Sequence, residues 1–257
     1  MLNFISTPIG NLNDISLRAI DVIRNSDYLY SEDTRKVQKL LKFIKIKVRP
    51  HSFYEHNELK VNKTIIKRLK QNNTISIVSD AGTPVISDPG YKLIQECVKN
   101  NIKYTLIPGP SSVISALIMS GLPTDKFSFY GFVPRKKSEQ ENFFESIVND
   151  EKTIVFFESS KRIEKTISNL VEFTGENRLI SICKEMTKIH EKTFRGKISE
   201  INLQIQKKQI NIKGEIVVVL QGLKNKHSQI FIDKDIKDKF LSKLSASESA
   251  KLISLIT

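Results

Sequence analysis

The first half of the chain repeats one pattern, and this pattern limits the possible folds more than any other feature. A short apolar segment ends in a turn of glycine, proline or small polar residues, and an amphipathic segment with helical spacing follows. Strands that alternate with helices in this way predict a mostly parallel sheet with helices on both faces. The five expected strands are residues 2–7, 27–31, 47–53, 74–80 and 103–109.

The pattern changes after the segment 108–123. Five further apolar segments follow, at 127–132, 153–159, 178–185, 192–197 and 215–222, with helices between only some of them. The expected fold class is therefore α/β with two lobes. We predict an N-terminal, mostly parallel α/β lobe over residues 1–112 and a C-terminal lobe with a mixed sheet over 113–222. Residues 223–257 read as a polar linker with a short helical tail.

The charge is strongly positive, with 41 basic and 28 acidic residues and a net charge of +13, which suits a polyanionic partner. Residues 35–49 hold seven basic side chains and no acid, and residues 135–137 form a second cluster. A solvated helix face usually carries both signs, so the one-sign stretch favours contact with the phosphates of such a partner. RNA is one such partner, and the candidate residues for binding its phosphates are Arg35, Lys36, Lys39, Arg135, Lys136 and, from a motif given below, Arg162.

Several classes of protein are disfavoured by the sequence. No apolar run approaches the roughly 20 residues of a membrane-spanning helix, so we expect no membrane partner and no signal peptide. The two cysteines, Cys97 and Cys183, lie far apart without a CxxC spacing, which indicates buried reduced thiols of a cytoplasmic protein. His51 and His56 do not have the spacing of ligands on one helix face, so no metal site is predicted.

Residues 79–90, with the sequence SDAGTPVISDPG, follow the expected central strand and form the most distinctive loop. The loop lacks the GxxxxGK[ST] pattern of a phosphate-binding loop, and its two carboxylates would repel a phosphate. Loops at the carboxyl ends of parallel strands are the usual place for a ligand in open α/β sheets. We expect Asp80 to face that ligand and Asp88 to cap the helix after Gly90, as Asp14 is expected to cap the helix at 15–25.

Several ordered motifs resemble the tetrapyrrole methylase superfamily and, within it, the bacterial 16S rRNA ribose 2′-O-methyltransferases. The motifs are TPIGNLNDI at 7–15, SEDTR at 31–35, SDAGTPVISDPG at 79–90, PGPSS at 108–112, GLPTDKF at 121–127, GFVP at 131–134, ESSKR at 158–162, KEMTK at 184–188 and KGE at 213–215. The resemblance spans residues 1 to about 222. The family's helical extension is matched only in part, so no role is assigned to the residues that follow.

The resemblance implies an enzyme that binds S-adenosyl-L-methionine in a cleft between two lobes, commonly as a homodimer. It also implies a cytidine of the decoding centre in 16S rRNA as substrate, with the small ribosomal subunit as the context. Carried over motif by motif, the candidate cofactor-binding residues are Pro8, Asp80, Gly82, Thr83, Val85, Ser111, Ser112, Phe157 and Gly214.

Methyl transfer to a hydroxyl needs an aligned acceptor oxygen, and a general base would add roughly 10²–10⁴-fold. Glu32 and Lys184 are the candidate catalytic residues. Glu158 and Arg162 are alternatively an ion pair that closes a helix start, and Arg162 could also bind phosphate. Two other functions stay open: a methylase of the same fold that acts on a tetrapyrrole or a modified protein residue, and a non-catalytic RNA-binding relative.

Overall fold

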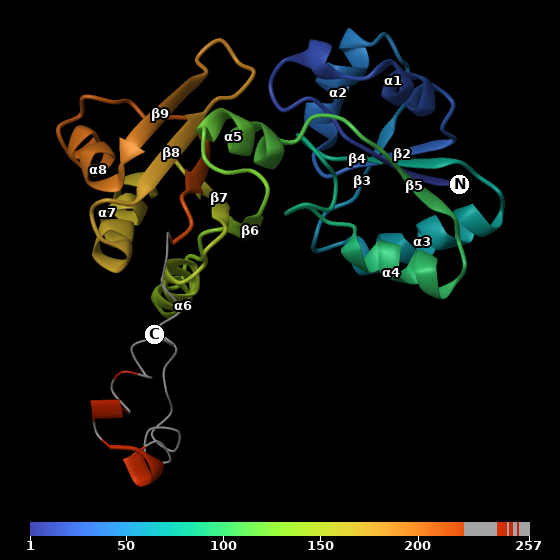
Figure 1. Ribbon diagram of the computed structural model, residues 1–257. Helices are drawn as coiled ribbons and strands as arrows, with labels where there is room; N and C mark the ends of the chain where they lie inside the picture. The colour runs from blue at the N-terminus through green and yellow to red at the C-terminus, as the bar shows by residue number, and fades with distance from the viewer. Residues whose placement is uncertain (224–240, 246, 249–250, 252–257) are drawn as a thin grey trace.

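The computed structural model describes residues 1–223, 241–245, 247–248 and 251, which form two α/β lobes and a separate C-terminal part (Figure 1). The linker and tail predicted at 223–257 lie largely outside the described residues. Each lobe contains one five-stranded sheet, and the expected α/β class with two lobes is confirmed. None of the helices within the described residues is long and apolar enough to cross a membrane.

The N-terminal sheet has the strand order β3-β2-β4-β1-β5, and all of its neighbouring strands are parallel. Its strands are β1 (Leu2–Ile5), β2 (Tyr28–Ser31), β3 (Pro50–Ser52), β4 (Ile75–Val78) and β5 (Tyr104–Ile107). Its helices are α1 (Leu17–Arg24), α2 (Thr34–Phe43), α3 (Glu58–Lys70) and α4 (Tyr91–Lys99), with a 3₁₀ turn η1 (Leu12–Asp14) before α1.

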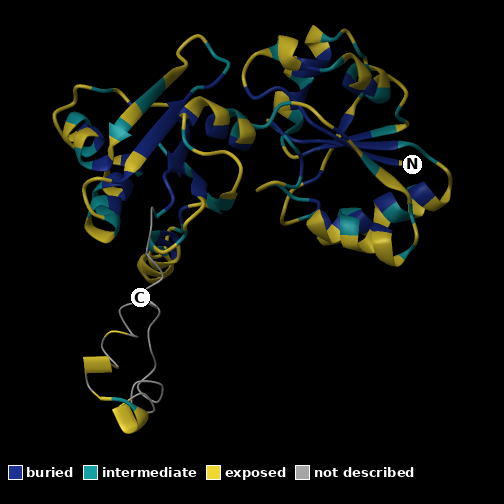
Figure 2. Ribbon diagram, in the orientation of Figure 1, coloured by how far each residue is buried: buried dark blue, intermediate teal, exposed yellow. Residues whose placement is uncertain are grey.

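The side chains of β1 point alternately to the two faces of the sheet, and each face packs against a layer of helices. Leu2 and Phe4 pack with the apolar cluster under α3 and α4, whereas Ile5 packs with the cluster under α1 and α2. The helix pairs therefore cover opposite faces of the sheet (Figure 1). Figure 2 shows that the inner strands β1, β2 and β4 are largely buried, whereas the edge strands and the outer faces of the helices are exposed.

Two predicted helix caps are wrong. Ser16, rather than Asp14, caps α1, because its side chain accepts a hydrogen bond from the amide of Ala19 at 3.1 Å. The N-cap of α4 is Gly90, with φ of 131°, and the side chain of Asp88 makes no capping hydrogen bond. The buried Glu58 of α3 accepts a hydrogen bond from the Gly90 amide at 3.1 Å, which leaves Asp88 free of this task.

The C-terminal sheet has the order β6-β7-β10-β8-β9 and is mixed, since β6 and β7 are parallel and the other pairs antiparallel. Its strands are β6 (Phe127–Phe132), β7 (Thr153–Ser159), β8 (Leu179–Lys184), β9 (Lys192–Lys197) and β10 (Glu215–Leu220). Its helices are α5 (Ser112–Ser120), α6 (Lys137–Val148), α7 (Ile163–Thr174) and α8 (Ile198–Gln206). The large core cluster contains side chains of α6, α7 and α8, and α5 packs on the other face with a second cluster.

The two lobes meet through the turn after β1 and through α5. Ile9 of the first lobe belongs to the apolar cluster of α5 and β10, and the Asn11 amide donates a hydrogen bond to the Thr187 hydroxyl at 3.0 Å. A Cβ built on Gly10 would lie 2.6 Å from side-chain atoms of Thr187 and Lys188, so this position needs glycine. The predicted seam between residues 112 and 113 falls in the first turn of α5, and that division stays a prediction.

Candidate active site

A cleft of about 550 Å³ lies between the lobes and is lined by loops at the ends of strands from both sheets. The N-terminal lobe contributes residues that follow β1, β2 and β4, and the start of α5 adds residues 111–113. The C-terminal lobe contributes Phe132, residues 157–160, Met186 and residues 214–217. The volume falls in the range of about 300–1,000 Å³ that is typical of small-molecule sites.

The central loop is fixed to the turn after β1 by a compact set of hydrogen bonds. Thr7 and Gly82 exchange two backbone hydrogen bonds of 2.9 Å. The Thr7 hydroxyl donates to the Ser79 carbonyl at 3.0 Å, and the Ser79 hydroxyl donates to the Gly82 carbonyl at 2.6 Å. Gly82 has φ of 84°, a conformation that glycine adopts without steric cost. The loop therefore presents its following residues to the cleft from a rigid base.

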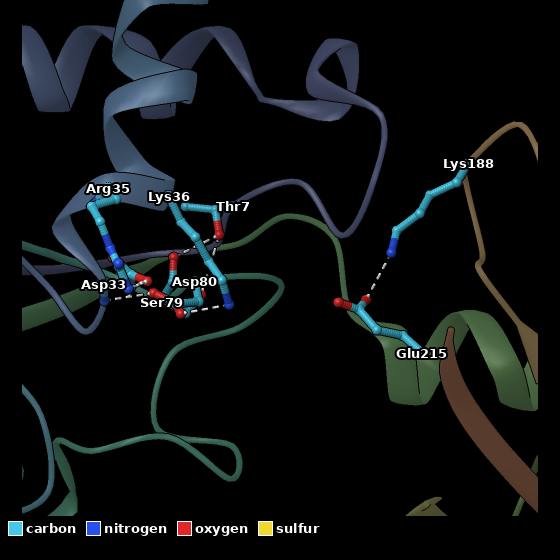
Figure 3. A network of polar contacts seen from close by, with 8 residues as sticks. All are labelled: Thr7, Asp33, Arg35, Lys36, Ser79, Asp80, Lys188 and Glu215. Carbon is cyan, nitrogen blue, oxygen red and sulfur yellow. Dashed lines mark hydrogen bonds and ion pairs between the residues drawn. The ribbon is translucent and has the colours of Figure 1, made fainter. Parts of the chain in front are cut away.

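Asp80 is held by donors from the loop and helix that follow β2 (Figure 3). Its carboxylate accepts hydrogen bonds from the Asp33 amide at 2.8 Å and from the Lys36 ammonium at 2.9 Å. This bond to Asp80 raises the pKa of Lys36. Arg35 forks onto both oxygens of Asp33 at 3.1 Å, and these hydrogen bonds lower the pKa of Asp33 to about 2. The resulting network fixes the position of one carboxylate in the cleft wall.

Two further carboxylates line the same cleft. Burial raises the pKa of Asp88 to about 7, and the negative charges of Glu32 and Asp80 add to the shift, while Lys36 opposes it. Burial also raises the pKa of Glu32, again with a contribution from Asp80. Carboxylates crowded in this way favour a ligand that is cationic or rich in hydroxyl groups.

The opposite wall carries its own ion-pair network at the start of β10 (Figure 3). Lys188 pairs with Glu185 and with Glu215, both at 3.1 Å, and Glu185 accepts a hydrogen bond from the Glu215 amide at 2.8 Å. Gly214 has φ of 100°, and a Cβ there would collide with the Glu185 carboxylate. The close approach explains why glycine precedes the strand.

Six of the nine predicted cofactor-binding residues line the cleft: Asp80, Thr83, Ser111, Ser112, Phe157 and Gly214. Three do not. Pro8 is buried at the junction, and Gly82 shapes the loop through its backbone. Val85 packs against the apolar cluster under α3 and α4, because its φ of 73° turns the chain at that point.

The two candidate catalytic residues lie in different surroundings. Glu32 lines the cleft and is exposed. Lys184 is 8% exposed, donates its ammonium to the Asn211 carbonyl at 3.0 Å and does not line the cleft. Glu32 can therefore contact a ligand in the cleft, whereas Lys184 lies inside the C-terminal lobe and cannot.

The candidate RNA-binding residues also divide. Lys36 lines the cleft, whereas Arg35, Lys39 and Arg135 are exposed on the surface, as is Lys136, which pairs with Glu139. Arg162 is turned inward. Its guanidinium pairs with the fully buried Glu158 at 2.8 Å and donates to the carbonyls of Val133 and Pro134 at 3.0 and 3.1 Å. The sequence allows two roles for Arg162, phosphate binding or an ion pair at a helix start. The structure has the ion pair, at the start of α7.

Sequence reasoning missed Asp88, Met186 and Glu215 as lining residues. Each of these residues lies in a motif that carries the family resemblance. Membership in such a motif is the signal from which a role in the cleft could have been predicted. Because Asp88 precedes a helix, local sequence rules predict a helix cap for it. The structure shows instead that Ser87, with φ of 63°, turns the loop so that Asp88 faces the cleft.

The residues present fit a methyl donor of the sulfonium type. Apolar side chains (Ile9, Val113, Phe132, Phe157 and Met186) form much of the lining and suit an adenosyl group, while the carboxylates suit its positive charges. Within the described residues no group of three or more His, Cys, Asp or Glu side chains has the arrangement of a metal site.

The fold and the cleft define an α/β protein of two lobes with one small-molecule site between them, built from strand-end loops of both sheets. Residues 1–202 match the family model described as Tetrapyrrole (Corrin/Porphyrin) Methylases. The chain belongs to this family.

Relatives with high sequence identity share one name. A protein of Thermotoga maritima named ribosomal RNA small subunit methyltransferase I is 44% identical over 221 residues, which cover 86% of this chain and 98% of the relative. The protein of the same name from Rickettsia prowazekii is 41% identical over 237 residues, covering 92% of this chain and 84% of the relative.

Solved structures with the same fold have little sequence identity to the chain. A diphthine synthase superposes with a TM-score of 0.65 at 15% identity, covering 86% of this chain and 89% of the other. A cobalt precorrin-4 methyltransferase gives 0.62 at 16% identity, covering 86% and 94%. These two likenesses support the fold alone.

Proposed function

We propose that the protein transfers a methyl group from S-adenosyl-L-methionine to the ribose 2′-hydroxyl of a decoding-centre cytidine in 16S rRNA. The observation that carries the proposal is the similarity to relatives named ribosomal RNA small subunit methyltransferase I, one of which is 44% identical and is covered over 98% of its length. The cleft adds support, because its apolar walls and carboxylates suit the cationic donor.

We assign residues that line the cleft to separate parts of the donor. Phe157 and Ile9 offer apolar contact to the adenosine part, and Ser111, Ser112 and Thr83 offer hydroxyl groups. Asp80, fixed by the Asp33 amide and Lys36, gives a negative charge in a set position. When bound, S-adenosyl-L-methionine supplies a methyl group on a positively charged sulfur. The chain's own task is to hold the acceptor oxygen in line with that methyl group.

The RNA surface begins at the rim of the cleft. Residues 35–49 carry seven basic side chains, and all of them are exposed in α2 and the segment that follows it. Lys39 and Arg135 have no ion pair with another described residue, so their charges are available for phosphates. Contacts of this kind weaken steeply with salt. We place the substrate strand along α2, with the reacting ribose entering the cleft beside Lys36.

The same proposal includes a homodimer in the cytoplasm, with the small ribosomal subunit as the substrate context. An exposed apolar surface supports the dimer: Tyr104 and Leu106 of the edge strand β5 are 42% and 45% exposed, and Ile114 and Ile118 of α5 are 45% and 68% exposed. β5 is one of the two edge strands of its sheet in the described part of the chain, and such an edge is usually covered.

The test uses labelled S-adenosyl-L-methionine with two substrates, naked 16S rRNA and small ribosomal subunits from cells that lack the methyltransferase. We expect label in RNA, and mapping of the labelled nucleotide should place it on a ribose in the decoding centre. Label on a base, or no label in either substrate together with no donor binding, would refute the proposal.

Two alternatives differ in substrate or in chemistry. A methylase for a tetrapyrrole or a modified protein residue would share the fold with the solved structures, but a small neutral or acidic substrate has no need of the basic stretch at 35–49. A non-catalytic RNA-binding protein would bind RNA without binding the donor. Donor binding by calorimetry separates that protein from an enzyme.

A further inference from the structure

A second hollow, which we call the α3–α4 groove, lies between these two helices on the face of the first lobe opposite α1 and α2 (Figure 1). Its volume is about 920 Å³, and no described residue lines both the groove and the cleft. Four of the eleven described residues that line it are lysines, and Glu96 is the single acid among them. The groove therefore attracts anions.

Hydrogen bonds fix the two helices at both ends of the groove. The Glu58 carboxylate accepts a hydrogen bond from the Gly90 amide at 3.1 Å and joins the starts of α3 and α4. At the far end, the Lys70 ammonium donates to the side-chain oxygen of Asn100 at 3.0 Å. The groove also begins close to the cleft, since Asp88 lines the cleft and Lys92, four residues further along the chain, lines the groove.

The lysines of the groove are available to a ligand. Lys63, Lys67 and Lys92 are exposed, and their side chains have no ion pair or hydrogen bond with any other described residue. Lys63, Lys67 and Lys70 recur at intervals of four and three residues, so they form a row on one face of α3. Successive lysines of the row are about 4.5–6 Å apart along the helix axis. A nucleic acid strand carries one negative charge per nucleotide, so such a row can contact consecutive phosphates.

Asn62, which also lines the groove, has a polar atom that the fold leaves without a partner. The residue is 4% exposed, and its Oδ1 atom accepts no hydrogen bond from any described residue. A buried acceptor without a hydrogen bond destabilises a fold, so a group of this kind indicates a ligand that supplies the donor. Leu59 and Ile66 lie on the same face of α3 and add apolar surface.

We propose that the α3–α4 groove binds a second segment of the 16S rRNA, with its lysines on phosphates and Asn62 on a ribose 2′-hydroxyl. The inference rests on the RNA substrate proposed above and adds a binding surface outside the cleft and outside α2. Every ribose of RNA carries a 2′-hydroxyl, and this group can donate a hydrogen bond to an amide oxygen such as Oδ1.

An acidic amphipathic helix of a protein is the other occupant with a suitable charge. Most of its backbone N–H groups are bonded within the helix, and its carboxylates only accept hydrogen bonds. Such a helix leaves the Asn62 oxygen unpaired, and for this reason we favour RNA.

The groove and α2 lie on opposite faces of the first lobe (Figure 1). RNA held on both faces is fixed on two sides of the cleft. The groove therefore increases affinity for large RNA and leaves donor binding and the transfer step unchanged.

The first experiment measures binding of the full chain to naked 16S rRNA by filter binding at several salt concentrations. Lys63→Gln combined with Lys67→Gln should weaken binding by about tenfold, which two exposed ion pairs can supply. The slope of log affinity against log salt should become shallower by about 1.4–1.8. Unchanged affinity in this double variant overturns the proposal.

The matched control is Lys165→Gln combined with Lys207→Gln, which removes the same charge from exposed positions on α7 and at the end of α8. Neither lysine has an ion pair with another described residue. This control should change the affinity by less than about twofold. Equal losses in the two double variants would show a general effect of net charge and would contradict a site in the groove.

Kinetics separate binding from catalysis. On small ribosomal subunits, the double variant of Lys63 and Lys67 should raise KM by about the factor lost in rRNA affinity, with kcat and the affinity for S-adenosyl-L-methionine unchanged. A fall in kcat at saturating subunits, or a loss of donor affinity, would connect these lysines with the cleft and overturn the proposal.

Asn62→Leu separates binding from stability. It removes the unpaired acceptor, so the midpoint of thermal unfolding should stay equal or rise, while rRNA affinity should fall by about threefold. A lower midpoint together with unchanged rRNA affinity would give Asn62 a structural role and overturn its assignment.

A crosslinking experiment identifies the occupant. Gln71 is exposed at one end of the groove, and both native cysteines are buried, so Gln71→Cys can carry a photoreactive group at a single accessible site. With small ribosomal subunits we expect crosslinks to 16S rRNA, and far fewer from Gln209→Cys, which is exposed on the second lobe. Crosslinks chiefly to a ribosomal protein would identify a protein partner instead and overturn the proposal.

The outcomes also separate this inference from the proposed function. If wild type neither binds nor methylates RNA, both fail together. If wild type methylates RNA while the groove variants behave like the control, only the assignment of the groove fails.

Discussion

Replacing Arg162 with methionine tests whether this residue belongs to the core of the C-terminal lobe or to the RNA surface. Its partner Glu158 has a fully buried side chain and also accepts hydrogen bonds from the Thr166 hydroxyl at 2.7 Å and the Ser159 amide at 2.6 Å. Removing one member of a buried pair costs about 3–5 kcal/mol, since the other charge stays buried without its partner. The Arg162 side chain is 28% exposed, so we expect the lower end, about 3 kcal/mol.

Urea unfolding followed by circular dichroism measures this cost at a fixed protein concentration. For a chain of this size, 3 kcal/mol corresponds to a fall of roughly 6–12 °C in the midpoint of thermal unfolding. Arg135→Met is the matched control, because Arg135 is exposed and has no ion pair with another described residue. It should change the free energy of unfolding by less than about 0.5 kcal/mol while weakening RNA binding.

The double variant Glu158→Gln with Arg162→Met sharpens the test. It removes the buried charge together with its partner, so it should be less destabilised than Arg162→Met alone. If Arg162→Met is as stable as Arg135→Met and loses RNA affinity to the same degree, the reasoning is refuted and Arg162 belongs to the RNA surface.

Three further predictions follow from the charges, the thiols and the junction of the lobes. The pKa of Asp88 is raised in the folded state to about 7, so its ionisation opposes folding, and the free energy of unfolding falls between about pH 4 and 7. Asp88→Asn should therefore stabilise the protein more at pH 8 than at pH 5 in urea titrations, and an equal effect at both values would contradict this sign. Cys97 and Cys183 are buried, and burial raises the pKa of Cys97 to about 11, so a thiol reagent at pH 8 should label neither in the native protein and both in urea. Fast labelling of native protein would show that a thiol is accessible. Gly10→Ala places a carbon 2.6 Å from side-chain atoms of Thr187 and Lys188, and this overpacking, of about 1–3 kcal/mol, should push the two walls of the cleft apart and weaken donor affinity. Gly121→Ala, whose new carbon meets no heavy atom within 4 Å but whose φ of 73° strains alanine, should lower stability and leave donor affinity unchanged in a calorimetric assay.

Much of the fold follows from periodicity alone. The apolar segments at 2–7, 74–78 and 153–159 are runs of β-branched and aromatic residues, and each contains the strand that the structure shows. The change from regular to irregular alternation near residue 120 is matched by the change from a parallel to a mixed sheet. A short, continuous run of β-branched and aromatic residues favours a buried strand over a helix or a loop. These strands can therefore be predicted from one sequence.

Contacts between distant segments determine the capping residues and the side-chain positions that the sequence does not predict. Asp14 and Asp88 are good capping residues, but Ser16 and the backbone at Gly90 take those positions. The carboxylate of Glu58, 32 residues away, satisfies the Gly90 amide, and no local rule predicts such a partner. Likewise Lys184 is charged and matches a motif, yet the Asn211 carbonyl holds its ammonium inside the lobe. Side-chain direction depends on distant segments, and a pattern of residue types does not contain it.

The position of β10 has a consequence for how the protein is made. This strand occurs last in the described order of strands but lies in the middle of its sheet, between β7 and β8. Until residues 215–220 leave the ribosome, β6 and β7 on one side and β8 and β9 on the other have no shared neighbour. One wall of the cleft, at residues 214–217, is absent for the same period. A growing chain can therefore complete its first lobe early, but it acquires a complete donor site only after nearly all of the second has been synthesised.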